Sequence, residues 1–176
     1  MKRVWILPTG DEIRDGIVLD LDSAEILRQV VQAFPCAEVT RVGPVADAED
    51  AIIQKISQVA AERPGLIVLI GGSGGGHRFS QTLGKDFTHS ALERFLDSAA
   101  SREIYGKNGH LWTKLLCGRK GDTYFINVPG PFVEAKAAMA AFLDTLRQNG
   151  DVDALCLAMA QAVYKQYPTG AAEEIL

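Results

Sequence analysis

The sequence predicts an α/β protein of three layers, with a doubly wound, mostly parallel sheet, helices on both of its faces, and one antiparallel hairpin. Two observations lead to this fold class. Patterns typical of strands and of helices alternate along most of the chain, as expected for parallel strands joined by crossover helices. In addition, the run LIVLI at residues 66–70 lies between glycines and is apolar throughout, which is typical of a strand buried on both faces.

The first half of the chain contains two strand patterns, and each precedes a helical pattern. Residues 3–7 form the first strand, and residues 38–42 alternate as a short second strand. The intervening helix covers residues 22–34, and Asp22 is well suited to be its N-cap. A second helix is predicted over residues 47–63, because its isoleucines and valines recur on one face.

The second half continues the alternation after the third strand. A helix is expected at residues 88–100, two strands at 111–117 and 123–128, and alanine-rich helices at 133–146 and 153–167. The two strands are separated by Gly118-Arg119-Lys120-Gly121-Asp122, which indicates a hairpin and therefore an antiparallel pair.

The composition favours a single soluble domain spanning residues 1–176, whose segment 161–176 includes a frayed C-terminal tail. The net charge of −4 provides no basic field for nucleic acid or for a membrane surface. Three widely spaced cysteines suggest free thiols rather than a disulfide framework. No apolar run is long enough to span a membrane, so we expect a cytoplasmic protein.

Three unusual loops follow predicted strands and would meet at one edge of a parallel sheet. They are Thr9-Gly10-Asp11-Glu12, the glycine run Gly71-Gly72-Ser73-Gly74-Gly75-Gly76, and Pro129-Gly130-Pro131. Open α/β sheets bind ligands beyond the carboxyl ends of their strands. Backbone N–H groups suit phosphate oxygens, whereas the carboxylates of Asp11, Glu12 and Asp86 suit Mg²⁺, hydroxyls or amino groups. The pattern therefore predicts a polar, phosphorylated organic ligand.

Two common nucleotide-binding motifs are excluded. Leu83-Gly84-Lys85-Asp86 has the glycine and lysine of a P-loop, but Phe79 stands where the first glycine is needed. The glycine run also lacks the third glycine of the dinucleotide-binding motif, since His77 occupies that position. The chain is therefore neither an ordinary P-loop ATPase nor a dinucleotide-dependent dehydrogenase.

Four segments, in the same order along residues 1–146, resemble the molybdopterin-binding domain. They are Gly10-Asp11-Glu12-Ile13 with Gly16-Ile17 and Asp20-Leu21-Asp22-Ser23, then LIVLIGGSG at 66–74, then Lys85-Asp86-Phe87-Thr88, and finally Gly121-Asp122-Thr123 through Val128-Pro129-Gly130-Pro131. This family includes the MoaB/Mog adenylyltransferases, the binding domain of the molybdate-insertion enzymes and the CinA-type proteins.

The resemblance implies molybdopterin binding in molybdenum cofactor biosynthesis. In its adenylyltransferase branch, Mg·ATP transfers AMP to the terminal phosphate of molybdopterin with release of pyrophosphate, and a partner protein then inserts molybdate. Asp86 and Asp47 would be the catalytic residues, and family members are often trimeric. The ligand-binding residues would be Gly10, Asp11, Glu12, Gly71, Gly72, Ser73, Gly74, Thr88, Pro129 and Gly130, and the sequence leaves any metal ligands unknown.

The chain departs from the family between its glycine run and Asp86. The insertion Gly75–Gly84, with His77 and Arg78 as candidate phosphate ligands, is longer than usual, and Lys85 replaces an arginine. A non-catalytic binding or sensor module is therefore the alternative, for molybdopterin or for another phosphorylated small molecule. The three aspartates also have purely structural alternatives. Asp47 and Asp86 each precede a helical pattern and could be its N-cap, and Asp11 could stabilise a turn.

Overall fold

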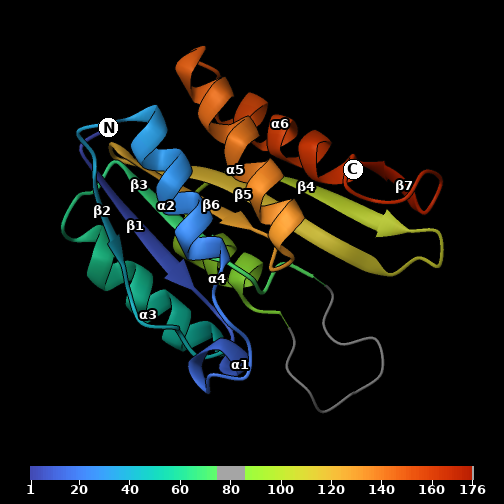
Figure 1. The fold of residues 1–176 in the computed structure, drawn as a ribbon, viewed down its shortest axis with the longest axis horizontal. Helices are drawn as coiled ribbons and strands as arrows, with labels where there is room; N and C mark the ends of the chain where they lie inside the picture. The colour runs from blue at the N-terminus through green and yellow to red at the C-terminus, as the bar shows by residue number, and fades with distance from the viewer. Residues whose placement is uncertain (75–85, 176) are drawn as a thin grey trace.

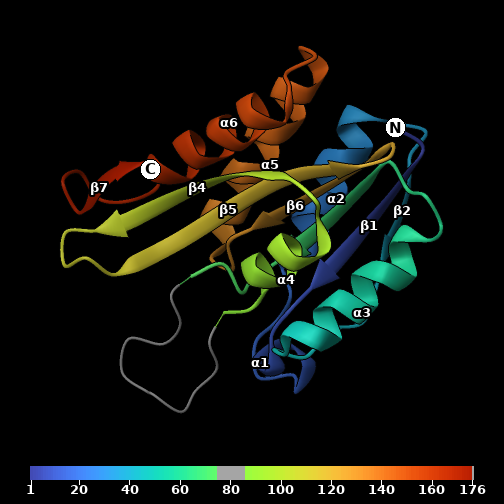
Figure 2. The same ribbon diagram turned by 180° about the vertical axis from the view of Figure 1, so that it is seen from behind.

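A computed structural model of the chain describes residues 1–74 and 86–175, which contain one seven-stranded sheet with helices on both faces (Figures 1 and 2). The strands are β1 (Arg3–Pro8), β2 (Glu38–Arg41), β3 (Leu66–Ile70), β4 (Ala99–Gly106), β5 (Leu111–Lys120), β6 (Thr123–Val128) and β7 (Ala172–Ile175). The helices are α1 (Asp11–Arg14), α2 (Asp22–Ala33), α3 (Glu49–Ala60), α4 (Thr88–Phe95), α5 (Phe132–Arg147) and α6 (Val152–Tyr164). The order of the strands across the sheet is β2-β1-β3-β6-β5-β4-β7.

The strands β2, β1, β3 and β6 run parallel to one another, which confirms the predicted fold class. Strand β3 lies between β1 and β6, and all five of its side chains are fully buried. Leu66, Val68 and Ile70 belong to one hydrophobic cluster, whereas Ile67 and Leu69 belong to a second cluster on the opposite face. The uninterrupted apolar run is therefore explained by a strand covered on both sides.

The helices divide between the two faces of the sheet. Buried residues of α2, α5 and α6 share the first cluster, and buried residues of α3 and α4 share the second. Figures 1 and 2 show the same arrangement, with α3 and α4 on the face away from α5 and α6. Two cores, one on each side of the sheet, hold the parallel strand ends at a common edge.

The antiparallel part of the sheet is larger than the sequence predicts. The hairpin of β5 and β6 is present and turns at Gly121, which has a φ of 60°. The helix expected over residues 88–100, however, ends at Phe95, and residues 99–106 form β4 instead. Strand β4 pairs along most of its length with β5, so tertiary pairing overrides the helical propensity of Ala99 and Ala100.

The C-terminal tail, which we expected to be frayed, adds a further strand. Helix α6 ends at Tyr164, and β7 then pairs antiparallel with β4 through Ile104–Ile175 and Gly106–Ala172. Ala172 is buried, so this strand extends the core to the end of the sheet. None of the helices in the described part of the chain is long and apolar enough to cross a membrane.

Candidate functional site

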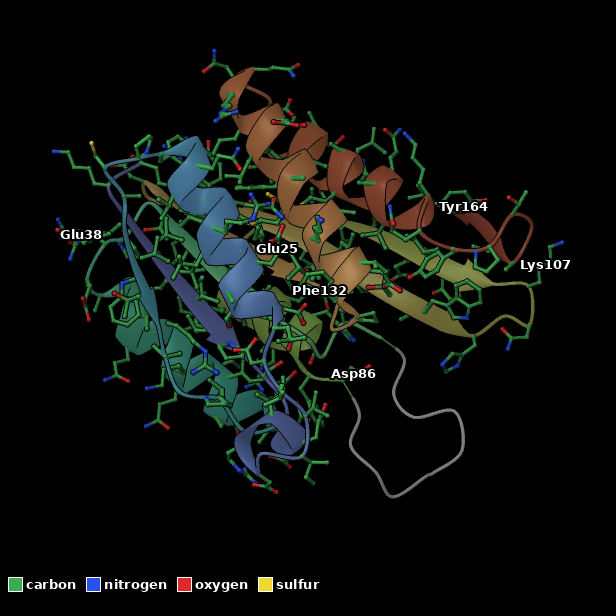
Figure 3. All side chains as sticks on the ribbon, viewed as in Figure 1. Glu25, Glu38, Asp86, Lys107, Phe132 and Tyr164 are labelled. Carbon is green, nitrogen blue, oxygen red and sulfur yellow. The ribbon has the colours of Figure 1, made fainter. Side chains whose placement is uncertain are left out.

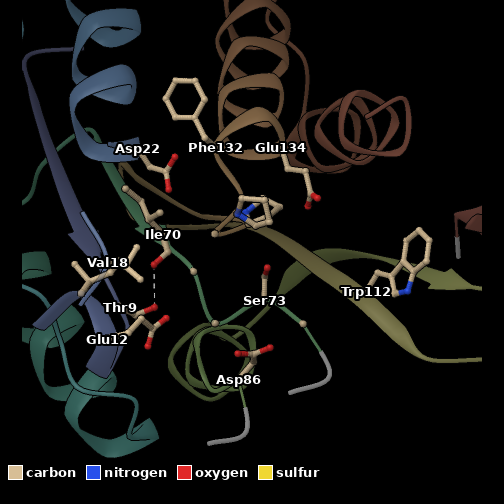
Figure 4. Close-up of a pocket in the computed structure, with 18 of the residues that line it drawn as sticks. Thr9, Glu12, Val18, Asp22, Ile70, Ser73, Asp86, Trp112, Phe132 and Glu134 are labelled. Atoms are coloured by element: carbon tan, nitrogen blue, oxygen red, sulfur yellow. Dashed lines mark hydrogen bonds between the residues drawn. The ribbon is translucent and has the colours of Figure 1, made fainter. Parts of the chain in front are cut away.

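A pocket of about 810 Å³ opens at the carboxyl ends of β1, β3 and β6 (Figure 4). Its walls include Gly10 and Glu12 after β1, the segment 71–74 after β3, and the segment 129–131 after β6. These loops therefore meet at one edge of the sheet, where α/β proteins bind their ligands. Phe132, in the first turn of α5, and Asp86, just before α4, lie at this same end of the sheet (Figures 3 and 4).

The glycine loop after β3 leaves its backbone open to a ligand. Gly71 and Gly72 have φ values of 88° and 58°, which other residues rarely adopt. A Cβ on Gly72 would lie 2.3 Å from Oγ1 of Thr88, and one on Gly74 would lie 2.7 Å from Oδ2 of Asp86. No backbone carbonyl in the described part of the chain accepts a hydrogen bond from the N–H groups of residues 72–74. Backbone donors of this kind suit phosphate oxygens.

Two buried threonines hold this loop against the sheet. Thr9 Oγ1 donates to the carbonyl of Ile70 at 2.9 Å, and it also hydrogen-bonds with Thr88 Oγ1 at 3.0 Å. The N–H of Thr88 donates to the carbonyl of Gly72 at 3.1 Å. Thr88 is fully buried and does not line the pocket. It therefore positions the glycine loop, although we expected it to bind the ligand directly.

Carboxylates gather beside the glycine loop. Glu12, Asp47 and Asp86 line the pocket, whereas Asp11 does not. Asp11 N donates to Asp47 Oδ2 and Asp47 N donates to Asp11 Oδ1, each at 3.3 Å. Burial raises the pKa of Asp47, and the charges of the three other carboxylates raise it further, against one opposing hydrogen bond from the Asp11 backbone. This wall therefore favours a cation or a proton donor.

The aspartates do not act as helix caps. Ala48 and Phe87 occupy the N-cap positions of α3 and α4, and neither N-cap side chain accepts a hydrogen bond from a backbone N–H of its helix. Asp47 and Asp86 thus lie outside the helices and line the pocket. Asp11 instead forms an ion pair with Arg14 at 2.7 Å within the short helix α1. The prediction that Asp47 and Asp86 could be helix N-caps is therefore wrong.

The opposite wall contains two carboxylates that sequence reasoning missed. Asp22 was expected to be the N-cap of α2, but Leu21 holds that position and Asp20 Oδ1 accepts a hydrogen bond from the N–H of Ser23. Asp22 lines the pocket instead, as does Glu134 in the first turn of α5. Glu134 follows Pro129-Gly130-Pro131 closely, so its place after a strand-end loop was a usable signal. Asp22 also lies in Asp20-Leu21-Asp22-Ser23, a segment that carries the family resemblance, although its local pattern indicated an N-cap.

Asp22 is a buried carboxylic acid, and the cost of its burial is not offset by a hydrogen bond to Oδ1 from a described residue. The residue is 8% exposed, and Oδ1 has no hydrogen-bond partner within the described residues. Burial, together with the charge of Asp20, raises the pKa of Asp22 to about 6. Glu134 is similar: burial raises its pKa, although Tyr167 donates a hydrogen bond to Oε2 at 3.1 Å.

The raised pKa of Asp22 predicts a pH-dependent stability difference. Between about pH 4 and pH 6 the folded chain keeps a proton on Asp22 that the unfolded chain has released, so stability falls as the pH rises through this window. We expect D22N to match the wild type near pH 4 and to exceed it by roughly 2 kcal/mol at pH 7. Urea unfolding at both pH values measures this, and an equal difference at pH 4 and pH 7 would contradict it.

Most residues predicted for the site line the pocket. They are Gly10, Glu12, Asp47, Gly71, Gly72, Ser73, Gly74, Asp86, Pro129 and Gly130, whereas Asp11 and Thr88 do not. The insertion Gly75–Gly84, with His77 and Arg78, and Lys85 lie outside the described residues. Trp112 also lines the pocket, where it packs against the first hydrophobic cluster and edge-on against Tyr167. Within the described residues, no three potential metal ligands converge on one point.

Comparisons with known proteins agree with this architecture. The profile of a family described as "Probable molybdopterin binding domain" matches residues 5–148. The molybdopterin biosynthesis enzyme MoaB from Thermus thermophilus has a similar structure, with 24% identity, a TM-score of 0.64, and coverage of 91% of this chain and 98% of that one. The tungsten cofactor synthesizing protein MoaB from Pyrococcus furiosus is 10% identical, with a TM-score of 0.61 and coverage of 84% and 94%. No curated protein matches the sequence.

Proposed function

The chain belongs to the molybdopterin binding domain family, whose profile spans most of its length, and we propose that the pocket binds molybdopterin in the biosynthesis of the molybdenum cofactor. The observation that carries this proposal is the meeting of the glycine loop with the loops after β1 and β6 around one pocket. The backbone N–H groups of the glycine loop suit the terminal phosphate of the ligand. Trp112 and Phe132, which both line the pocket, offer aromatic side chains to its fused rings.

We further propose that the chain adenylylates the bound molybdopterin. An oxygen of the terminal phosphate would form a bond to the α-phosphorus of ATP, the bond from that phosphorus to its bridging oxygen would break, and pyrophosphate would leave. The carboxylates of Asp47 and Asp86 would hold Mg²⁺ together with phosphate oxygens, and the ion would neutralise charge on the transferring group. One or two protein carboxylates are usual for such a site, because Mg²⁺ keeps waters and substrate phosphates as its other ligands.

The charged residues around the pocket support one end that binds phosphates and another that binds the pterin. Glu12 and Asp47 form no ion pair with a described residue, so they are available to a metal–phosphate complex. Arg14 pairs with Asp11 and Asp15, and so it balances part of the negative charge behind the pocket. The phosphates would therefore lie between the glycine loop and the acidic wall, with the pterin toward α2 and α5.

A non-catalytic carrier or sensor is the second candidate. The observation that favours it is the insertion Gly75–Gly84, which separates the glycine run from Asp86 further than is usual in the family. Such a module would bind molybdopterin and hand it unmodified to a partner that inserts molybdate. The two candidates share one ligand and differ in whether pyrophosphate is released.

Equilibrium binding of molybdopterin with ATP and Mg²⁺, followed by mass analysis of the recovered ligand, tests the proposal. Recovery of adenylylated molybdopterin with an equal amount of pyrophosphate would establish the transferase. Recovery of unmodified molybdopterin would favour the carrier. Failure to bind molybdopterin would overturn the proposed function and leave another phosphorylated small molecule as the ligand.

We also propose that the protein is a cytoplasmic homotrimer, as its resemblance to the family implies. Exposed apolar side chains outside the pocket support self-association: Ile17 is 78% exposed and Val133 is 56% exposed. A sedimentation mass of three times 19.0 kDa is the expected result, and a mass of one chain would contradict it.

A further inference from the structure

We propose that Asp22 and Glu134 accept hydrogen bonds from a 2-amino-4-oxopyrimidine ring of the ligand, and that they select it over rings without the amino group. This edge presents an amino group beside a ring N–H, and it occurs in both pterins and guanine. The proposal deepens the proposed function and rests on it, since the pocket is taken to bind a phosphorylated heterocycle.

The first argument is the unmet hydrogen-bonding capacity of Asp22. The residue is more than nine-tenths buried, yet Oδ1 accepts no hydrogen bond from any described residue. Figure 4 shows its carboxylate directed from α2 toward the pocket. A buried carboxylate usually accepts several hydrogen bonds, and one left without them is destabilising. A ligand that donates N–H groups would supply them.

The second argument is the arrangement of Glu134. It enters the same pocket from α5, and the hydroxyl of Tyr167 donates to its Oε2 at 3.1 Å. This hydrogen bond orients the carboxylate and uses one oxygen, so Oε1 is left for a ligand. Neither Asp22 nor Glu134 forms an ion pair with a described lysine or arginine. Both therefore favour donors from the ligand.

The third argument is the surface between the two acids. Phe132 lies between Asp22 and Glu134 in Figure 4, and the prolines of segment 129–131 line the same pocket. Flat apolar side chains flanked by acceptors suit the face and the N–H edge of a planar heterocycle. The glycine loop, with its backbone donors, lies across the pocket and suits the phosphate. The glycine loop thus suits the phosphate of the ligand, and the opposite end of the pocket suits its heterocycle.

Titration calorimetry at pH 7.5 with paired probes tests this inference. The first pair is 6-hydroxymethylpterin phosphate and 6-hydroxymethyllumazine phosphate, which differ in the 2-amino group. The second pair is GMP and IMP, which differ in the same group. We expect the amino-bearing member to bind at least about tenfold more tightly, because a charge-assisted hydrogen bond is lost without it. D22N and E134Q should each reduce this ratio, whereas D15N, an exposed acid outside the pocket, should keep it.

The outcomes separate the inference from the proposed function. A preference for the pterin that D22N removes would support both. A preference for GMP over IMP without any pterin binding would support the role of Asp22 and Glu134 but overturn molybdopterin as the ligand. An unchanged ratio in both D22N and E134Q would overturn the inference even if molybdopterin binds, because a merely structural role would shift both members of a pair equally.

Discussion

Replacing Asp86 by asparagine is expected to reduce the rate of pyrophosphate release with molybdopterin and Mg·ATP by at least about 100-fold. Asp86 lines the pocket just before α4, and its Oδ2 lies 2.7 Å from the position that a Cβ on Gly74 would take. Its carboxylate is therefore next to the backbone donors that would hold the phosphates. An amide of the same shape keeps the local packing but removes the charge that would bind the metal ion. A pyrophosphate-coupled assay at saturating ATP measures the effect.

The variant D122N is a matched control for this experiment. Asp122 is fully exposed at the turn between β5 and β6 and lies outside the pocket. Both variants remove one negative charge, so a difference between them reflects location rather than net charge. Circular dichroism should show the same fold for D86N as for the wild type. A D86N protein that releases pyrophosphate at the wild-type rate would contradict the assigned role of Asp86.

The parts of the site that the sequence predicts well depend on short segments of chain. The strand Leu66–Ile70 and the glycines that follow it could be recognised because apolar runs and glycine loops have local physical causes. Their meeting with Gly10 and Pro129 follows from parallel strand topology alone, since the carboxyl ends of parallel strands share one edge. Such inferences need no knowledge of side-chain packing.

The parts that could not be predicted depend on contacts between distant segments. Asp22 has the sequence context of an N-cap, and its place at the pocket follows only from the way α2 and α5 bring their N-terminal ends to one wall. Likewise, Ala99 and Ala100 favour a helix locally, and the pairing of β4 with β5 decides their conformation. In both cases the deciding interaction joins residues far apart in the chain.

The free energy of unfolding should fall by about 3 kcal/mol when Gly72 is replaced by alanine. Two effects add at this position. The φ of 58° is unfavourable for alanine, and the new Cβ would lie 2.3 Å from Oγ1 of Thr88, a side chain fixed by its hydrogen bond to Thr9. The same displacement would move the glycine loop, so molybdopterin binding should weaken as well. Urea unfolding and equilibrium binding measure the two effects.

Comparison with G121A separates the clash from the backbone strain. Gly121 has a φ of 60°, close to that of Gly72, but a Cβ there would meet nothing within 4 Å. We expect G121A to lose only about 1 kcal/mol, since it carries the conformational cost alone. Adding T88A to G72A should recover part of the loss, because it removes the clashing oxygen, while T88A alone is destabilising through the lost hydrogen bond. If G72A and G121A lose equal stability, the contact between the glycine loop and Thr88 does not determine the shape of this wall of the pocket.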